Sequence, residues 1–327
     1  MKIGNFVGNN ALKGQLISMF ANNKVPHAII LEGEPGTGKK TFANIIATFA
    51  VCEHFNKDAC YECNSCKKAL SGMHPDIILP EKAGVLQAVN VSEVRKIKKD
   101  AYVVPNEAPY KVYIFTDIDN MGIQAQNSLL KVLEEPPGNV IFIFTCVNLG
   151  NILPTVRSRA QIFKLGKVQY SEAVNFILKT YKNQSKDSVN EAVKLSCGNI
   201  GKAIEFLNED SVKNSIILVE KIVDAISEQN AFDIMVGLGK TLEEKKELKN
   251  MLILLYLRVK DALLLCISGK CEYKSEASVR LSKTIDVKKI FKVLAVLEKS
   301  MQMCEQNVNK DLIVTYICAE LYKLICT

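Results

Sequence analysis

The sequence predicts an α/β domain built on a parallel sheet, followed by a small helical domain and an all-α C-terminal domain. Three observations predict this order. Short apolar runs alternate with helical patterns through residues 1–165, a glycine-rich loop follows the first run directly, and helical periodicity alone continues after Glu209. We place the three domains at 1–167, 168–208 and 209–327.

The strands of the first domain are read from uninterrupted apolar runs at 27–31, 112–115 and 140–144. Such runs are typical of strands that are buried on both faces of a parallel sheet. Apolar residues at helical spacing follow the glycine-rich loop at 41–52, and a second helix is predicted at 124–135, where two prolines end it. A strand that leads into a glycine-rich loop and then a helix is the arrangement of a phosphate-binding loop.

The remainder of the chain has a helical pattern. Helices are expected over 171–181, 186–196, a segment after Gly201, 212–227, 243–267, 287–305 and 310–326. The most apolar stretch, 251–267, contains Arg258, Lys260 and Asp261, so it predicts a packed helix and no membrane span.

Composition places the chain among ordinary globular proteins. Of its 327 residues, 48% are hydrophobic and 24% are charged. The net charge of +7 is compatible with a nucleic-acid or phosphate-bearing partner, but a solvated lysine-rich surface explains it equally well. The N-terminus lacks the apolar core of a signal peptide. We therefore expect a cytoplasmic protein whose cysteines are reduced or bound to metal.

Four cysteines form a cluster with metal-ligand spacing: Cys52, Cys60, Cys63 and Cys66. Four thiolates this close together suit a tetrahedral, structural Zn²⁺ ion. Unliganded thiols, a redox-active pair and an iron–sulfur cluster are the alternatives. The other cysteines lie in apolar contexts and are expected in cores: Cys146, Cys197, Cys266, Cys271, Cys304, Cys318 and Cys326.

The glycine-rich loop departs from the phosphate-binding pattern G-x-x-x-x-G-K-[ST] at one position. Gly33, Gly38 and Lys39 are in register, but Lys40 occupies the place of the hydroxyl that binds Mg²⁺, and Thr41 comes one residue late. An ammonium group has no lone pair with which to coordinate a cation. The sequence thus predicts a degenerate site that binds nucleotide weakly or not at all, although its backbone N–H groups can still hold phosphates.

Other polar residues follow the later strands. Thr116-Asp117-Ile118-Asp119 comes after the second run, where a nucleotide hydrolase needs carboxylates, but acids at strand ends are often turn residues, and Asp119 is equally explained as a cap of the next helix. Thr145, at the end of the third run, is best explained as a hydroxyl that caps backbone. Arg159 is either a solvated surface charge or an arginine finger.

In combination these motifs resemble the AAA+ clamp-loader proteins of bacterial DNA replication, which belong to DNA polymerase III. The resemblance covers the whole chain and rests on Pro26–Ala28, the four clustered cysteines, Gly72–Asp76, Asn127–Pro137, Ser158-Arg159 and Asn307–Thr315. It implies a RecA-like AAA+ P-loop domain with a zinc-binding insertion at about 52–66, a helical lid domain over 168–208, and a collar domain for oligomerisation over 209–327.

The family contains working ATPases and a non-motor subunit. Four departures of this sequence from the pattern of the ATPases favour the non-motor subunit. Lys40 replaces the metal-binding hydroxyl, Thr116 falls where the ATPases carry a metal-binding Asp, with Asp117 in the place of the catalytic Glu, and Gly201 falls where they carry a second sensor Arg. The chain also stops at Thr327, without the long extension of tau. The finger position is kept, although alanine replaces the usual cysteine after it.

The resemblance therefore implies a stator subunit that assembles with gamma/tau and delta subunits. The complex loads the beta sliding clamp onto primed DNA, and Arg159 would act in trans on a neighbouring ATPase. No intrinsic ATPase is expected, although ATP or ADP at Gly33, Gly38, Lys39 and Thr41 stays open as binding without hydrolysis.

Two other functions are weighed against this one. The first is a gamma/tau-like ATPase in which Thr41 takes the metal; a shift of one residue turns a side chain by about 100° around the helix, which opposes it. The second is a stand-alone DNA-binding module, but tryptophan is absent and the best basic run, at 95–99, is better explained as the solvated face of a helix.

Overall fold

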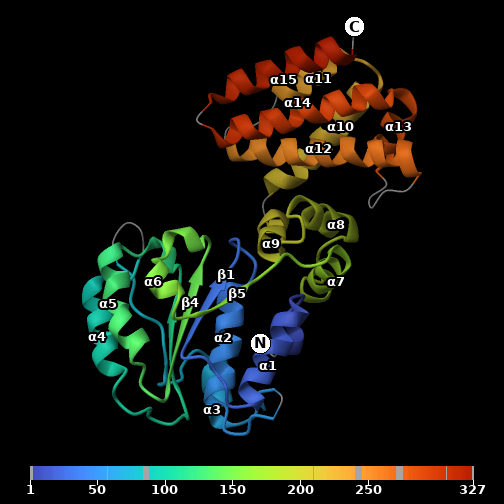
Figure 1. Ribbon diagram of the computed structural model, residues 1–327. Helices are drawn as coiled ribbons and strands as arrows, with labels where there is room; N and C mark the ends of the chain where they lie inside the picture. Colours follow the sequence, from blue (N-terminus) through green and yellow to red (C-terminus); the bar gives the residue numbers. More distant parts are fainter. Residues whose placement is uncertain are drawn as a thin grey trace. The chain divides into compact units, whose positions relative to one another are not determined.

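The computed structural model describes residues 3–56, 58–83, 88–208, 210–239, 245–269, 275–306 and 308–325. The chain divides into two compact units (Figure 1). The first comprises Met1–Thr180 with Gly198–Lys202, and the second comprises Tyr181–Cys197 with Ala203–Thr327. The segment 168–208 is shared between the two units, and the division into three domains stays a prediction.

The first unit contains a parallel sheet with strand order β2-β3-β4-β1-β5 among the described residues. Its strands are β1 (Ala28–Glu32), β2 (Ile77–Ile78), β3 (Lys111–Phe115), β4 (Val140–Cys146) and β5 (Gln161–Lys164). The three predicted runs form the three central strands, as expected for fully buried segments. Sequence analysis missed both edge strands, because β2 has two residues and β5 buries only Phe163.

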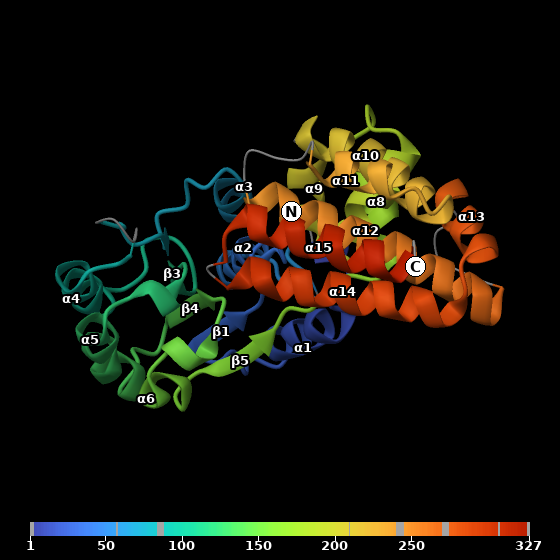
Figure 2. The ribbon, with the colours of Figure 1, turned by 90° about the horizontal axis from the view of Figure 1, so that it is seen from above.

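Helices cover both faces of this sheet (Figures 1 and 2). The helices of this unit are α1 (Asn10–Ala21), α2 (Lys39–Val51), α3 (Asn64–Leu70), α4 (Val91–Asp100), α5 (Ile123–Glu134), α6 (Pro154–Arg157) and α7 (Tyr170–Thr180). Alternate residues of β1 face opposite cores: Ile29 and Leu31 pack with α1 and α2, whereas Ala28 and Ile30 pack with α4 and α5. This alternation explains why the strands are apolar without interruption.

The second unit consists of helices around one apolar core. Its helices are α8 (Lys186–Leu195), α10 (Asp210–Ser227), α11 (Ala231–Gly239), α12 (Lys245–Ser268), α13 (Glu276–Thr284), α14 (Val287–Glu305) and α15 (Lys310–Ile325), while α9 (Ile200–Asn208) spans the boundary between the units. Helix α12 contacts α8, α10, α13 and α14. The helices that the sequence predicted here are confirmed; α11 and α13 were missed.

The charged residues of α12 are buried in this unit. Arg258 is 1% exposed, and its guanidinium binds Glu191 of α8 and Glu220 of α10. Asp261 forms a second ion pair with Lys194 of α8 at 3.2 Å. The prediction of a packed helix is confirmed, and within the described ranges no helix is long and apolar enough to cross a membrane.

The scattered cysteines only partly follow the prediction. Cys146 is buried, and Cys266, Cys304 and Cys318 lie half-buried against the helical core. Cys197 is exposed, which corrects its assignment to a core, because it lies in the turn after α8 with a left-handed φ of 49°. Cys271 and Cys326 lie outside the described residues, as does Asn307 of the C-terminal motif.

Candidate functional site

The glycine-rich loop connects β1 to α2, which begins at Lys39. Gly36 and Gly38 both have a φ of 86°, a conformation that strongly favours glycine, and Gly38 precedes the first turn of α2. Lys40 is exposed on that turn and Thr41 is half-buried. The structure therefore has the backbone of a phosphate-binding loop at the end of the predicted strand.

Lys39 is bound to the loop itself. Its side chain is buried, and its Nζ donates hydrogen bonds to the carbonyl oxygens of Gly33 at 2.6 Å and Glu34 at 3.0 Å. Burial lowers the pKa of this ammonium, and the nearby Asp117 opposes that effect. A phosphate at this loop would have to replace both carbonyls as the partner of Lys39.

A segment of the same unit, 198–202, lies directly against the loop. The N–H of Gly201 donates to the carbonyl of Gly36 at 3.0 Å, and the side-chain amide of Asn199 donates to the carbonyl of Pro35 at 2.8 Å. A Cβ atom at position 201 would stand 2.4 Å from Gly36 Cα. Glycine is thus required at 201, where the resemblance places a sensor Arg in working ATPases.

Glu34 adds ion pairs to this contact. Its carboxylate lies 3.1 Å from Lys202 Nζ and 3.3 Å from Lys167 Nζ. The hydrogen bond from Lys202 is the main reason that the pKa of Glu34 is lowered. The sequence pattern assigns no role to Glu34 or Asn199, because only the folded chain brings 198–202 to the loop.

The two acids after β3 are engaged in structural contacts. Asp117 has a left-handed φ of 57° and pairs with Lys82 at 2.8 Å, while its N–H donates to the Thr145 hydroxyl at 3.0 Å. Thr145 therefore caps backbone, as predicted. Together these contacts fix the C-terminal ends of β3 and β4 to each other.

The expectation that Asp119 caps the next helix is wrong. Its Oδ2 accepts hydrogen bonds from the N–H groups of Val147 and Asn148, at 2.9 and 3.2 Å, so it holds the loop after β4 and does not cap the helix that follows it. Asp119 Oδ1 is buried and has no hydrogen-bond partner among the described residues. A helix cap can be predicted from residues that are adjacent in the sequence. The contact of Asp119 with the loop after β4 cannot, because it joins the ends of two different strands.

Arg159 lies two residues beyond α6, and its side chain is 33% exposed. Its NH1 donates to the carbonyl of Thr155 at 2.9 Å and to Ser158 Oγ at 3.2 Å, and its NH2 pairs with Glu134 Oε1 at 2.8 Å. The sequence identified Arg159 but missed Glu134, which is the last residue of α5.

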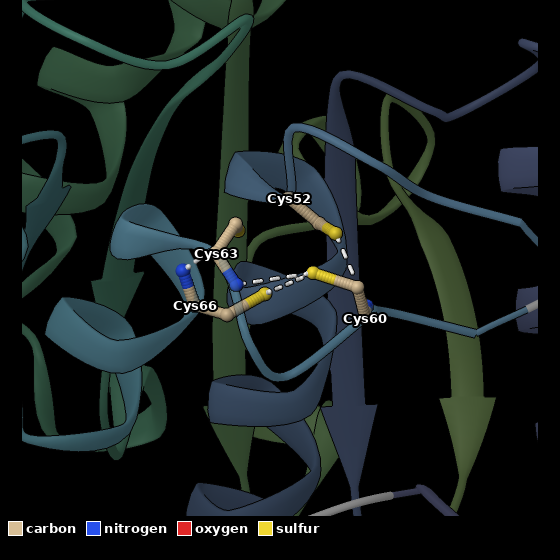
Figure 3. Close-up of side chains that lie close together, drawn as sticks. All are labelled: Cys52, Cys60, Cys63 and Cys66. Atoms are coloured by element: carbon tan, nitrogen blue, oxygen red, sulfur yellow. Dashed lines mark hydrogen bonds between the residues drawn. The ribbon is translucent and has the colours of Figure 1, made fainter.

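The four clustered cysteines meet between α2 and α3 (Figure 3). Their sulfur atoms all lie within 4.8 Å of one another. Sulfurs bound tetrahedrally at about 2.3 Å from a zinc ion are about 3.8 Å apart, and the Sγ atoms of Cys60 and Cys66 are 3.9 Å apart. The cluster therefore fits a four-thiolate metal site.

Backbone N–H groups favour the thiolate form of Cys60, whereas burial raises the pKa of Cys52 and of Cys66. The N–H of Cys60 points at Cys52 Sγ, that of Cys63 at Cys60 Sγ and that of Cys66 at Cys63 Sγ, each at 3.3 Å. Hydrogen bonds from the backbone of Glu62 and Cys63 lower the pKa of Cys60 to about 6. Thiolates are the form that binds metal.

The sequence of this chain is similar to those of DNA polymerase III subunits. A family model described as "DNA polymerase III, delta subunit" matches residues 8–169. Subunit gamma/tau of Mycoplasma genitalium is 30% identical over 236 residues, which are 69% of this chain and 39% of that protein. The chain thus spans about two fifths of the length of this gamma/tau relative.

Two relatives are delta' (delta-prime) subunits of DNA polymerase III. The Bacillus subtilis protein is 24% identical over 224 residues, with 67% of each chain covered. The Yersinia pestis protein is 31% identical over 153 residues, which are 46% of this chain and 44% of that protein. Gamma/tau and delta' relatives therefore match at similar levels of identity.

Proposed function

The chain belongs to the clamp-loader family of DNA polymerase III subunits, and from that premise we propose that it is the delta-prime subunit. In this role it is a non-motor stator that assembles with gamma/tau and delta subunits. The assembly loads the beta sliding clamp onto primed DNA during replication. The runner-up is a gamma/tau-like ATPase, which the gamma/tau relatives support at comparable identity.

The observation that carries the proposal is the closed state of the glycine-rich loop. Lys39 binds two carbonyls of its own loop, and Gly201 and Asn199 bind two more. The Lys39 ammonium, which would contact the phosphates of a nucleotide, is thus already hydrogen-bonded to the loop, and the carbonyls of Pro35 and Gly36 tie the loop to residues 198–202. Opening the loop would break these bonds before any nucleotide contact forms, which favours a subunit without a working ATPase.

Residue chemistry around the loop supports the same conclusion. A Mg²⁺ ion at a P-loop needs a hydroxyl oxygen and a carboxylate. Lys40 stands in the place of the hydroxyl and Thr116 in the place of the carboxylate, while the nearby Asp117 is paired with Lys82. The two positions that hold the metal of an ATP–Mg²⁺ complex in the ATPases of the family therefore carry neither that hydroxyl nor that carboxylate in this chain.

Arg159 is the group that we propose acts on a neighbour. A stator can lose its own metal ligands and still insert an arginine into the active site of an adjacent subunit. The side chain of Arg159 is 33% exposed, and the residue lies two positions beyond the short helix α6. In this role Arg159 would stabilise the charge of the transferring phosphate, an effect on the order of 10³–10⁵ in rate.

Cys52, Cys60, Cys63 and Cys66 would hold a structural Zn²⁺ ion in the same proposal. The set consists of sulfur ligands only and includes two buried residues, Cys52 and Cys66. A closed set of four thiolates leaves no open coordination position, so the metal would stabilise the connection between α2 and α3 and take no part in chemistry.

An ATPase assay on the purified chain tests the non-motor role. With ATP and Mg²⁺ we expect no turnover above background, and no change in Lys39→Ala, because the metal ligands are missing. Hydrolysis by the wild-type chain that disappears in Lys39→Ala would instead identify the gamma/tau-like ATPase.

A second experiment tests membership of the complex. The chain is mixed with its cognate gamma/tau and delta subunits and analysed by size-exclusion chromatography. We expect one complex, formed equally well by Arg159→Ala but with a lower ATPase rate. Arg157→Ala, two residues earlier, is the matched control and should keep the rate. Failure to co-elute would contradict the assignment, and an unchanged rate in Arg159→Ala would contradict the finger.

A further inference from the structure

The ion pair between Glu134 and Arg159 joins two motifs that are separate in the sequence. Glu134 ends the segment Asn127–Pro137, and Arg159 is the finger position. We propose that Glu134 is a positioning residue for Arg159: its carboxylate holds the guanidinium in the orientation in which it meets the nucleotide of a neighbouring subunit. This inference rests on the proposed finger role.

The local contacts of Arg159 are not enough to orient it with respect to the sheet. Thr155 and Ser158 bind NH1, but both belong to the same short segment as Arg159. Helix α6 has four residues and cannot by itself be rigid. Glu134 belongs to a different element, α5, and its carboxylate lies 2.8 Å from NH2 of Arg159.

Helix α5, which carries Glu134, is firmly fixed in the first unit. Leu129, Val132 and Leu133 are at most 2% exposed and pack in the core on one face of the sheet. The position of the Glu134 backbone is therefore determined by core packing, so its carboxylate is a stable reference point for the guanidinium.

The same helix also holds the start of the finger segment. Gln126 is 1% exposed; its amide donates to the carbonyl of Asn151 at 3.1 Å and accepts from the N–H of Leu153 at 2.9 Å. Gln126 and Glu134 thus bind the two ends of residues 151–159 from one helix. This arrangement is what a support for a finger requires, because both ends of the segment are bound to α5.

The ion pair has little to contribute to folding. Its partners are 33% and 48% exposed, and exposed pairs add less than about 1 kcal/mol to stability. The guanidinium has five N–H donors. Within the described residues its NH1 and NH2 groups are bound, whereas its Nε forms no hydrogen bond. Donors are therefore left for an anionic partner while the carboxylate fixes the orientation.

The test is Glu134→Gln in the assembled clamp loader, with Glu135→Gln as the matched control. Glu135 is the adjacent exposed residue and its carboxylate has no ion pair recorded within the described ranges. The measured quantity is the Arg159-dependent rate, defined as the ATPase rate of the wild-type complex minus that of the Arg159→Ala complex. We expect Glu134→Gln to lower this rate roughly tenfold, as small misplacement of a catalytic group does, and Glu135→Gln to keep it.

Two further measurements separate positioning from a structural role. In the Arg159→Ala background, Glu134→Gln should have no additional effect on the ATPase rate. The thermal midpoint of the isolated chain should also stay the same. An unchanged or increased Arg159-dependent rate in Glu134→Gln, or an equal effect in both backgrounds, would overturn the inference. If Arg159→Ala itself changes nothing, the proposed finger fails instead.

Discussion

Asp76 is completely buried, and both of its carboxylate oxygens accept hydrogen bonds. The donors are the backbone N–H groups of Asn106, Glu107 and Ala108 and the side-chain amide of Asn106, at 2.6–3.0 Å. These bonds fix the loop that leads into β3. Asp76 belongs to the motif Gly72–Asp76, which the sequence connected with the family but not with a physical role.

Asp76→Asn should destabilise the first unit. Burial raises the pKa of Asp76, but the hydrogen bonds from Asn106, Glu107 and Ala108 outweigh it and the pKa is lowered. The carboxylate therefore contributes stability above its unfolded pKa of about 3.9, and this is lost as the pH falls through its lower folded pKa. We expect a loss of about 2–3 kcal/mol at pH 7, measured by urea unfolding, that shrinks below pH 4.

The control for Asp76→Asn is Glu205→Gln, which changes an exposed carboxylate in the same way. It should leave the free energy of unfolding nearly unchanged at both pH values. If the difference between wild type and Asp76→Asn were the same at pH 7 and at pH 3, the ionised carboxylate would not be the source of the stability.

At the scale of elements, the cysteine cluster joins the end of α2 to the start of α3. Cys52 follows the last residue of α2, and Cys63 caps α3, where its sulfur accepts from the N–H of Cys66. Phe49 and Cys52 both pack in the core on the face of the sheet that α1 and α2 cover, so the cysteine cluster is continuous with that core. If the cluster holds the proposed Zn²⁺ ion, its removal should destabilise α2.

We expect about one equivalent of zinc per chain in elemental analysis of the purified protein. Cys60→Ser should lose the zinc and lower the thermal midpoint, because a set of four thiolates becomes incomplete. Cys197→Ser, which changes an exposed cysteine outside the cluster, is the control and should retain both. A full zinc content in Cys60→Ser would contradict the site.

At the scale of the whole molecule, the chain has two compact units, and α8 belongs to the second one. Arg258 connects α12 to α8 and α10 through Glu191 and Glu220, and Lys194 of α8 pairs with Asp261. Buried ion pairs are strongly destabilising when one partner is removed, because a charge is left without compensation. The network therefore makes α8 part of the helical unit.

Arg258→Met should destabilise the second unit by about 3–5 kcal/mol. Hydrogen exchange followed by mass spectrometry should show lost protection in α8, α10 and α12 and unchanged protection in the sheet. The control is Arg280→Met, whose ion pair with Asp224 is half exposed and worth less than about 1 kcal/mol. Equal effects of the two substitutions would contradict the role of burial.

Much of the fold and part of the site follow from the sequence alone. The central strands and most helices of the second unit were predictable, because their hydrophobic patterns are local and uninterrupted. The cysteine cluster and the loop with Lys39 and Lys40 were also predictable, because the spacing of these residues already defines their chemistry. Edge strand β5 was not, since it buries a single residue.

Only the tertiary structure decided how these residues are used. It showed that Lys39 binds its own loop, that Gly201 contacts Gly36, and that Glu134 forms an ion pair with Arg159. Residues 36 and 201 are far apart in the chain, and no periodicity relates them. Local pattern thus determined the elements and the types of side chain at the candidate sites, whereas long-range packing determined that the glycine-rich loop contacts residues 198–202 and that Arg159 pairs with Glu134.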